Sequence, residues 1–366
     1  MKYIGSLAFA GLAILPLLLG AAETLAREDT PAALERALVL EGWAGPPAAR
    51  LERLAGLAPL RSIELRRRAL RSHPRRASAW IALGLEYERS GDLEEAEGAL
   101  LEAARVDRQL LPAWTLANYY FRRGDRAAFW TWAGRAAERT YDDFRPLLRL
   151  SQSMEPDPAR ALDALGSSAR LERAYLDFLI GEQRLEQADA VARRMLARRA
   201  PEDRRRLADL VTRQIRAGRA GAALELWNRL FVPLDAGRGP VLTNGDLGQA
   251  PTGIGFDWTL AETPGVTAEW SPGALMFTFS GAQADGFTLL EQAIPVAAGK
   301  SYRVWCDCPD DGRLQWEWDR GAAGRELATL RLVYRRSAGV EPLRGRGTVR
   351  NIRLEVVAEK LREPAP

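Results

Sequence analysis

The stretch AWIALGLEYERSGDLEEAEGALLEAARVDR, residues 79–108, decides the fold of the N-terminal half. Four of its residues share one face of a predicted α-helix because they recur every three or four positions: Trp80, Leu83, Gly84 and Tyr87. Gly84 permits the close approach of a neighbouring helix, and Gly91 supplies a turn before a second amphipathic helix. The stretch therefore predicts a pair of packed antiparallel helices.

The pattern repeats along the chain. Trp114 follows Trp80 by 34 residues, and the Gly-Asp turn at Gly124 follows the one at Gly91 by 33. The spacing of the first helix, the turn, and the small and apolar positions Ala96, Leu100 and Ala103 of the second helix resemble a tetratricopeptide repeat. The resemblance implies an α-helical solenoid that binds protein partners.

Further helix pairs are predicted after these two units. Residues 171–180 pair with 185–199, and residues 203–217 pair with 220–230. Residues 31–72 are also predicted to be helical, with packing positions at Leu51, Leu54, Leu57 and Leu60. We assign residues 27–235 to the tetratricopeptide-like helical repeat domain.

The residue pattern of the sequence changes after Phe231. Prolines and glycines mark a linker, and short alternating runs such as GALMFTFSG, YRVWCDC and ATLRLVYRR then follow one another. They predict an antiparallel β-sandwich over residues 236–360, followed by a tail at 361–366. The fold class is thus α + β multidomain, a helical solenoid followed by a jelly-roll-type β-sandwich.

Three short stretches of this β region resemble carbohydrate-binding modules and galactose-binding-like jelly rolls. They are LTNGDL at 242–247, GFDW at 255–258 and GKSYRV at 299–304. Members of this group often hold a structural calcium through an acid in the closing strand, but residues 350–353 read Arg-Asn-Ile-Arg. We therefore expect no metal there. The order of export segment, repeats and sandwich resembles bacterial proteins of polysaccharide-export loci.

The N-terminus predicts export. After Lys2, residues 3–22 carry no charge, which is the layout of a signal peptide and also the length of one membrane-spanning helix. Residues 1–26 are therefore either a cleaved signal peptide or a membrane anchor. Both alternatives place the protein outside the cytoplasm, periplasmic or anchored to the inner membrane and facing the periplasm. The membrane is contacted only through this segment.

The basic residues do not indicate nucleic-acid binding. Three of the 52 lysine and arginine residues are lysines, so 49 are arginines, and they are mixed with acids along the whole chain. A nucleic-acid surface needs a basic face with interleaved aromatic or base-reading groups. The formal net charge of only +4 agrees with salt-bridged, solvated helix faces.

The sequence lacks the common catalytic motifs. His73 is the only histidine, and no phosphate-binding Gly-x-x-x-x-Gly-Lys-Ser/Thr or Gly-x-Ser-x-Gly motif occurs. We therefore predict a non-catalytic protein without cofactor or metal. The alternative from another class is a polysaccharide-acting enzyme that uses two acids of the β region, Glu317 and Asp319.

The stretch SYRVWCDCPDDGRLQWEWDR, residues 301–320, combines two cysteines with three tryptophans. Alternation predicts a hairpin in which Trp305 pairs near Gln315, and the apolar faces of both strands meet the core. Cys306 and Cys308 are expected to be buried thiols, with a disulfide as the alternative and metal binding the least favoured.

Trp305 is the residue that a hairpin does not explain, because it points outward. An exposed indole beside planar polar groups can stack on a sugar ring. The glycan-binding candidates are Trp305, Arg303, Asp307, Gln315 and Glu317. The alternative is that the repeats or a loop cover Trp305, which would make the protein purely a protein–protein adaptor.

The repeats offer a second candidate surface. Alignment on the Gly-Asp turns places Leu85 and Arg89 of one unit over Asn118 and Arg122 of the next, facing one groove. Such side chains grip peptide amides and carboxylates. The alternative is an internal ion pair with an acid such as Glu88. Together these features predict an exported scaffold that binds protein through its repeats and glycan through its sandwich, in exopolysaccharide assembly or export.

Overall fold

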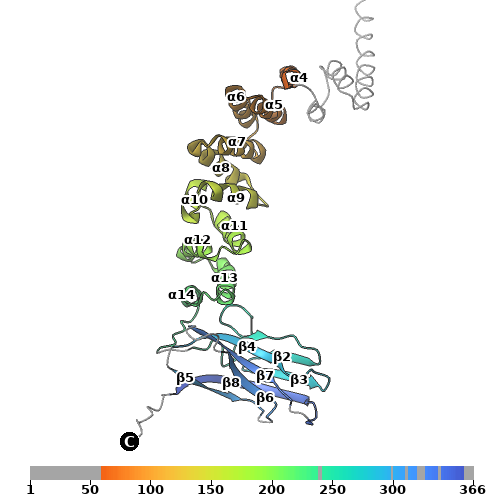
Figure 1. Cartoon of the computed structure of the whole chain (residues 1–366), viewed down its shortest axis with the longest axis vertical. Coiled ribbons are helices and arrows are strands. Elements are labelled where there is room, and N and C mark those ends of the chain that lie inside the picture. The colour runs from red at the N-terminus through yellow and green to blue at the C-terminus, as the bar shows by residue number, and fades with distance from the viewer. Residues whose placement is uncertain are drawn as a thin grey trace, which may run out of the picture. The chain divides into compact units, whose positions relative to one another are not determined.

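The fold is described from a computed structural model of the whole chain (Figure 1). The structure describes residues 59–357 except 238–240, 298–299, 310–311, 320–325 and 337–338. The predicted signal peptide or anchor at 1–26, the packing positions Leu51, Leu54 and Leu57, and the tail at 361–366 lie outside the described residues. None of the helices in the described part combines the length and apolarity needed to cross a membrane.

The chain divides into two compact units between Leu171 and Glu172. The helices of the first unit are α4 (Pro59–Ser72), α5 (Ala77–Ser90), α6 (Leu93–Val106), α7 (Leu110–Arg123), α8 (Arg126–Arg139), α9 (Arg145–Met154) and α10 (Pro158–Leu165). The boundary crosses α11 (Ala169–Gly181). The second unit continues with α12 (Leu185–Arg198), the short η2 (Pro201–Asp203), α13 (Arg204–Arg216) and α14 (Ala220–Leu230), and then the strands.

Glycines set the geometry of the first complete pair, α5 with α6. A Cβ added to Gly84 would lie 2.7 Å from Leu100 Cδ2, so only glycine allows the two helices to come this close. Gly91 ends α5 with a φ of 88°, and the amide of Asp92 then donates to the Tyr87 carbonyl at 2.9 Å. These contacts confirm the helical repeats predicted from residues 79–108.

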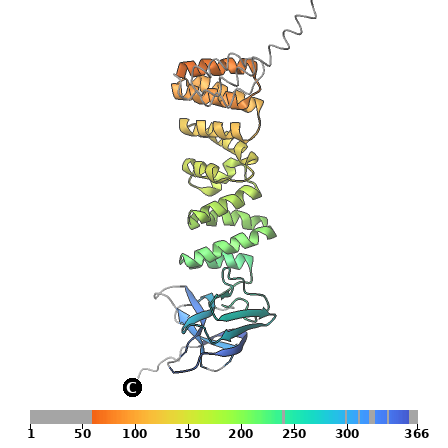
Figure 2. The ribbon, with the colours of Figure 1, turned by 90° about the vertical axis from the view of Figure 1, so that its right-hand side faces the viewer.

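The later pairs also follow the prediction. The pairs α11 with α12 and α13 with α14 occupy the predicted ranges within a few residues, and α13 lies against α14 in both views (Figures 1 and 2). One pair was not predicted. The helices α9 and α10 have only 10 and 8 residues, too short to show a clear helical period in the sequence.

The strands form two antiparallel four-stranded sheets, in the orders β1-β4-β7-β6 and β2-β3-β8-β5. The strands are β1 (Thr259–Leu260), β2 (Val266–Ser271), β3 (Ala274–Ser280), β4 (Phe287–Pro295), β5 (Ser301–Asp307), β6 (Leu314–Asp319), β7 (Leu327–Tyr334) and β8 (Arg344–Val357). One hydrophobic core includes residues of both sheets, such as Phe277 of β3 and Leu330 of β7. The α + β class is thus confirmed, while the jelly-roll topology stays a prediction.

The predicted β5–β6 hairpin is wrong. Trp305 of β5 pairs with Arg353 of β8, whereas Gln315 of β6 pairs with Val333 of β7 in the other sheet. The apolar faces nevertheless meet the core as predicted, and the Tyr302 ring lies 6.0 Å from a β6 tryptophan. Alternation specifies which face is buried, but it does not distinguish a neighbour in the same sheet from one across the core.

Within the second unit, the loop before β1 packs on the last helix pair. The amide of Gly255 donates to Thr212 Oγ1 at 2.7 Å, and a Cβ at Gly255 would lie 2.4 Å from the Trp227 ring. The Trp227 and Phe256 rings meet edge to face, 5.6 Å apart. The segment that the sequence marks as a linker is therefore in packed contact with α13 and α14.

Candidate functional site

Trp305 is exposed, as predicted. Half of its surface (50%) is accessible, and its neighbours Arg303 and Asp307 on β5 are exposed as well. The indole Nε1–H donates to Glu355 Oε2 of β8 at 2.9 Å, and the Arg303 guanidinium lies 5.9 Å from the ring centroid. These two contacts orient the ring on the outer face of the sheet and leave an apolar surface open to solvent.

The remaining glycan candidates are not brought to this site. Gln315 and Glu317 lie on β6, in the other sheet, where Glu317 is hydrogen-bonded to Arg335, the residue that follows β7. Because the inner faces of both sheets contact the shared core, their outer faces point in opposite directions. The predicted five-residue set is therefore divided, and only Arg303, Trp305 and Asp307 share a surface.

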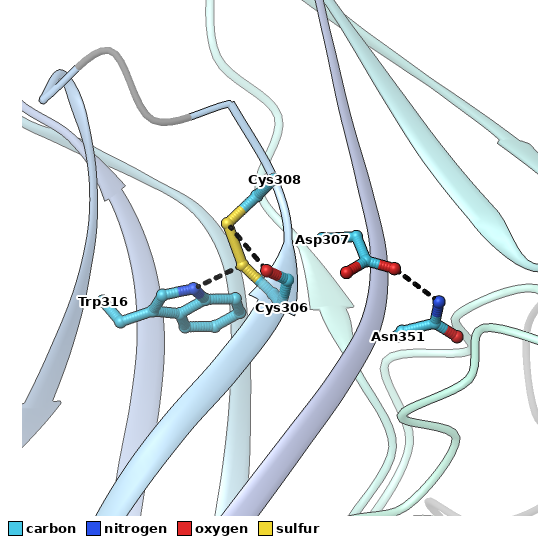
Figure 3. The surroundings of a disulfide bond; sticks show 5 residues. All are labelled: Cys306, Asp307, Cys308, Trp316 and Asn351. Atoms are coloured by element: carbon cyan, nitrogen blue, oxygen red, sulfur yellow. Dashed lines mark hydrogen bonds between the residues drawn. A yellow bond between two sulfur atoms is a disulfide. The ribbon is translucent and has the colours of Figure 1, made fainter.

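Residues of β8 complete the Trp305 surface, although the sequence pattern of β5 did not predict them. Arg353 lies directly opposite Trp305, and Arg350 lies opposite Asp307. Asn351 has a positive φ of 49° beside a register shift, and its Nδ2 donates to Asp307 Oδ2 at 2.6 Å (Figure 3). The alternation RGRGTVRNIRLEV was a usable signal for these exposed positions, but only once the pairing of β5 with β8 was known.

The cysteines form a disulfide, with their Cα atoms 5.5 Å apart. A straight strand would separate these atoms by about 6.6 Å. The pairing of β5 shifts register between Trp305 and Asp307, and this irregularity lets Cys306 and Cys308 approach each other. The expectation of two free buried thiols is therefore wrong. Trp316 donates its Nε1–H to Cys306 Sγ at 3.2 Å, on the side that faces the core (Figure 3).

The predicted repeat groove is occupied by internal contacts. Arg122 binds Glu88 with two hydrogen bonds of 2.7 and 2.6 Å, which raise the pKa of its guanidinium. Asn118 donates to the Trp114 carbonyl of its own helix at 2.8 Å. Arg89 pairs with the buried Glu86 at 2.8 Å, and Leu85 is half-buried. The alternative of an internal ion pair with Glu88 is thus what the structure contains.

A different surface of the repeats forms a cleft that the described residues leave unfilled. A cleft of about 480 Å³ lies over α4, α5 and α6, and we call it the α4–α6 cleft. The α5 side chains in it are apolar: Trp80, Leu83 and Tyr87. Leu70 of α4 and the small residues Gly98 and Ala99 of α6 complete the apolar surface, and Arg67, Arg71 and Glu95 are its charged members.

The two arginines at the cleft differ from Arg66, which precedes them on α4. Arg66, one position before Arg67, is buried and lies 4.0 Å from Glu86. Arg67 and Arg71 are exposed, and neither has an ion-pair partner within the described residues; Arg67 lies 5.3 Å from the centroid of the Tyr87 ring. The cleft therefore combines an apolar floor with two available positive charges.

The two acids of the enzymatic alternative lie beside arginines. Arg335 hydrogen-bonds to Glu317 and lowers the pKa of that carboxyl below its usual value. Asp319 Oδ2 lies 3.6 Å from a guanidinium nitrogen of Arg331. A general acid in glycoside hydrolysis requires a raised pKa, so the lowered pKa of Glu317 is opposite to that one role.

The chain has limited similarity to known proteins. A solved structure described as "YrrB: a TPR protein with an unusual peptide-binding site" matches with a TM-score of 0.27 and 14% identity, over 54% of this chain and 90% of that chain. No protein-family model and no curated protein matches. A TM-score this low carries no functional argument.

Proposed function

We propose that this protein is a non-catalytic scaffold whose helical repeats bind a protein partner in the α4–α6 cleft. The observation that carries the proposal is an apolar floor with two exposed arginines, Arg67 and Arg71, that lack ion-pair partners among the described residues. An unfilled apolar cleft in a helical array is a common place for a peptide to dock.

The charges of the cleft specify the chemistry of the partner. An apolar side chain would replace water over Leu83 and Tyr87, and carboxylates beside it would pair with the guanidiniums of Arg67 and Arg71. Glu95 is the one acid among the described residues that line the cleft, and it would accept a hydrogen bond from an amide or pair with a cation of the peptide. The partner is therefore a segment with an apolar anchor flanked by Asp or Glu.

Selection of a random phage-displayed peptide library on the full chain tests this proposal, with fluorescence anisotropy on the selected synthetic peptides. We expect enriched peptides to carry Leu or an aromatic residue beside acids. The double substitution R67E/R71E should weaken them about tenfold or more. The matched control R108E/R123E changes two exposed arginines outside the cleft by the same charge and should have little effect. Basic or neutral consensus peptides, or equal losses in both variants, would overturn the proposal.

A second candidate function rests on Trp305. Its exposed ring, held by Glu355 and flanked by Asp307 and Asn351, supplies an apolar stacking surface beside hydrogen-bonding groups, which favours a sugar ligand.

We propose that the protein acts outside the cytoplasm and tethers its protein partner to glycan in exopolysaccharide assembly or export. The uncharged run at residues 3–22 supports this location.

The lowered pKa of Glu317 argues against that residue as the general acid of a glycosidase. A purely protein–protein adaptor is less favoured, because Trp305 is open to solvent rather than covered.

A further inference from the structure

A row of arginines lies on the same outer face as Trp305. On β8 the exposed Arg346, Arg350 and Arg353 alternate with positions that face the core, apart from the irregularity at Asn351. Arg303 of β5 adds a fourth exposed guanidinium beside the indole. From residue 346 to residue 353 the row extends for about 20 Å at the usual strand rise.

These four arginines have no ion-pair partner among the described residues. The two nearest acids on the paired strands are engaged with neutral donors. Asp307 lies opposite Arg350 in the register but accepts from Asn351, and Glu355 lies opposite Arg303 but accepts from Trp305. The positive charge of the face is therefore available to a ligand.

The outer face of the other sheet shows the opposite arrangement. Arg331 of β7 lies 3.1 Å from Glu291 and 3.6 Å from Asp319, its neighbours on β4 and β6. Arg335 is paired with Glu317. The two faces share the same arginine-rich composition, yet among the described residues the guanidiniums of the Trp305 face are unpaired and Arg331 and Arg335 are paired. Composition alone does not account for this difference.

We propose that the Trp305 face binds an acidic polysaccharide, a sugar chain that carries carboxylates. This inference rests on the proposed glycan-binding function and specifies its ligand class. A pyranose ring stacks on the indole, carboxylates pair with the guanidiniums of Arg350 and Arg353, and hydroxyls bond to Asp307 and Glu355.

Nucleic acid fits this face less well. Single-stranded nucleic acid binds to several aromatic rings that stack successive bases, and the described part of this outer face offers one exposed ring, Trp305. The carboxylates of Asp307 and Glu355 beside it accept hydrogen bonds, and a phosphodiester backbone offers them no donor. Both acids are compatible with sugar hydroxyls.

Calorimetric titration of the full chain tests the inference with two probes that share one backbone, oligogalacturonate and its fully methyl-esterified form. Esterification keeps the sugar ring and removes the charge. We expect the ester to bind about tenfold or more weakly, the effect of losing one charge-assisted hydrogen bond. R350Q/R353Q should weaken the acid to the level of the ester, and R331Q/R335Q on the other sheet is the matched control. Circular dichroism verifies that each variant is folded.

The outcomes separate the two proposals. Equal binding of acid and ester that is lost in W305A would leave glycan binding intact and overturn the acidic ligand. Failure of the folded full chain to bind either probe would overturn both for this class of sugar chain. Tighter binding of a single-stranded oligonucleotide than of oligogalacturonate, at the same salt concentration, would assign the face to nucleic acid and overturn the inference.

Discussion

Two glycines in the first complete helix pair respond in opposite ways to the same substitution. A Cβ at Gly84 of α5 would lie 2.7 Å from Leu100 Cδ2 and 3.1 Å from the Ala96 carbonyl oxygen. Leu100 is 1% exposed, so its side chain has little room to move away. A Cβ at Gly98 of α6, which is exposed, would meet nothing within 4 Å.

The magnitudes follow from two opposing effects. Replacing a glycine inside a helix with alanine stabilises the helix by about 1 kcal/mol. Forcing an extra methyl into a packed interface costs about 1–3 kcal/mol. We therefore expect Gly98→Ala to raise the free energy of unfolding by about 1 kcal/mol and Gly84→Ala to lower it by about 0–2 kcal/mol.

Urea denaturation of the full chain, followed by far-UV circular dichroism, measures both variants under identical conditions. The difference between the variants is the informative quantity, because a chain with two units need not unfold in one step. An equal gain in stability for Gly84→Ala and Gly98→Ala would refute the close packing of α5 on α6.

Three further predictions concern the β region. Gly245→Ala should destabilise it by about 2 kcal/mol or more, because the new Cβ would lie 2.4 Å from the Ile352 carbonyl, whereas Gly248→Ala should be tolerated; thermal unfolding compares them. In an NMR titration the Glu317 carboxyl should show a pKa below its usual value and return toward it in R335Q; the stabilisation from this lowered pKa is present above the unfolded-state pKa and is lost as the pH falls through the folded-state pKa. Alkylation followed by mass spectrometry should label the two cysteines only after reduction, and labelling of the unreduced protein would contradict the disulfide.

Local patterns in the sequence predicted most of the helical region. The spacing of Trp80, Leu83, Gly84 and Tyr87, and the turns at Gly91 and Gly124, are properties of neighbouring residues, and the structure places them as expected. The pairing of β5 depends on a strand some 50 residues away, so alternation within β5 could not reveal it.

The candidate sites were predicted only in part for the same reason. Exposure of Trp305 follows from alternation, and the structure confirms it. Its surroundings come from β8, and the predicted contribution of Gln315 followed from the wrong pairing. The repeat alignment placed Arg122 in a groove. Alignment does not show that the guanidinium of Arg122 is hydrogen-bonded to Glu88 of the preceding unit.

The most direct test of partner binding is a substitution that fills the α4–α6 cleft without disturbing the repeats. Gly98 lines the cleft, and its Cβ direction is open, so Gly98→Leu places a side chain where the peptide anchor would lie while α6 gains helix propensity. Glu94→Leu adds the same side chain to an exposed position of α6 outside the cleft. Fluorescence anisotropy with a selected acidic peptide should show about tenfold or more weaker binding to Gly98→Leu and unchanged binding to Glu94→Leu. Undiminished binding to a folded Gly98→Leu variant would contradict the assignment of the cleft as the binding site.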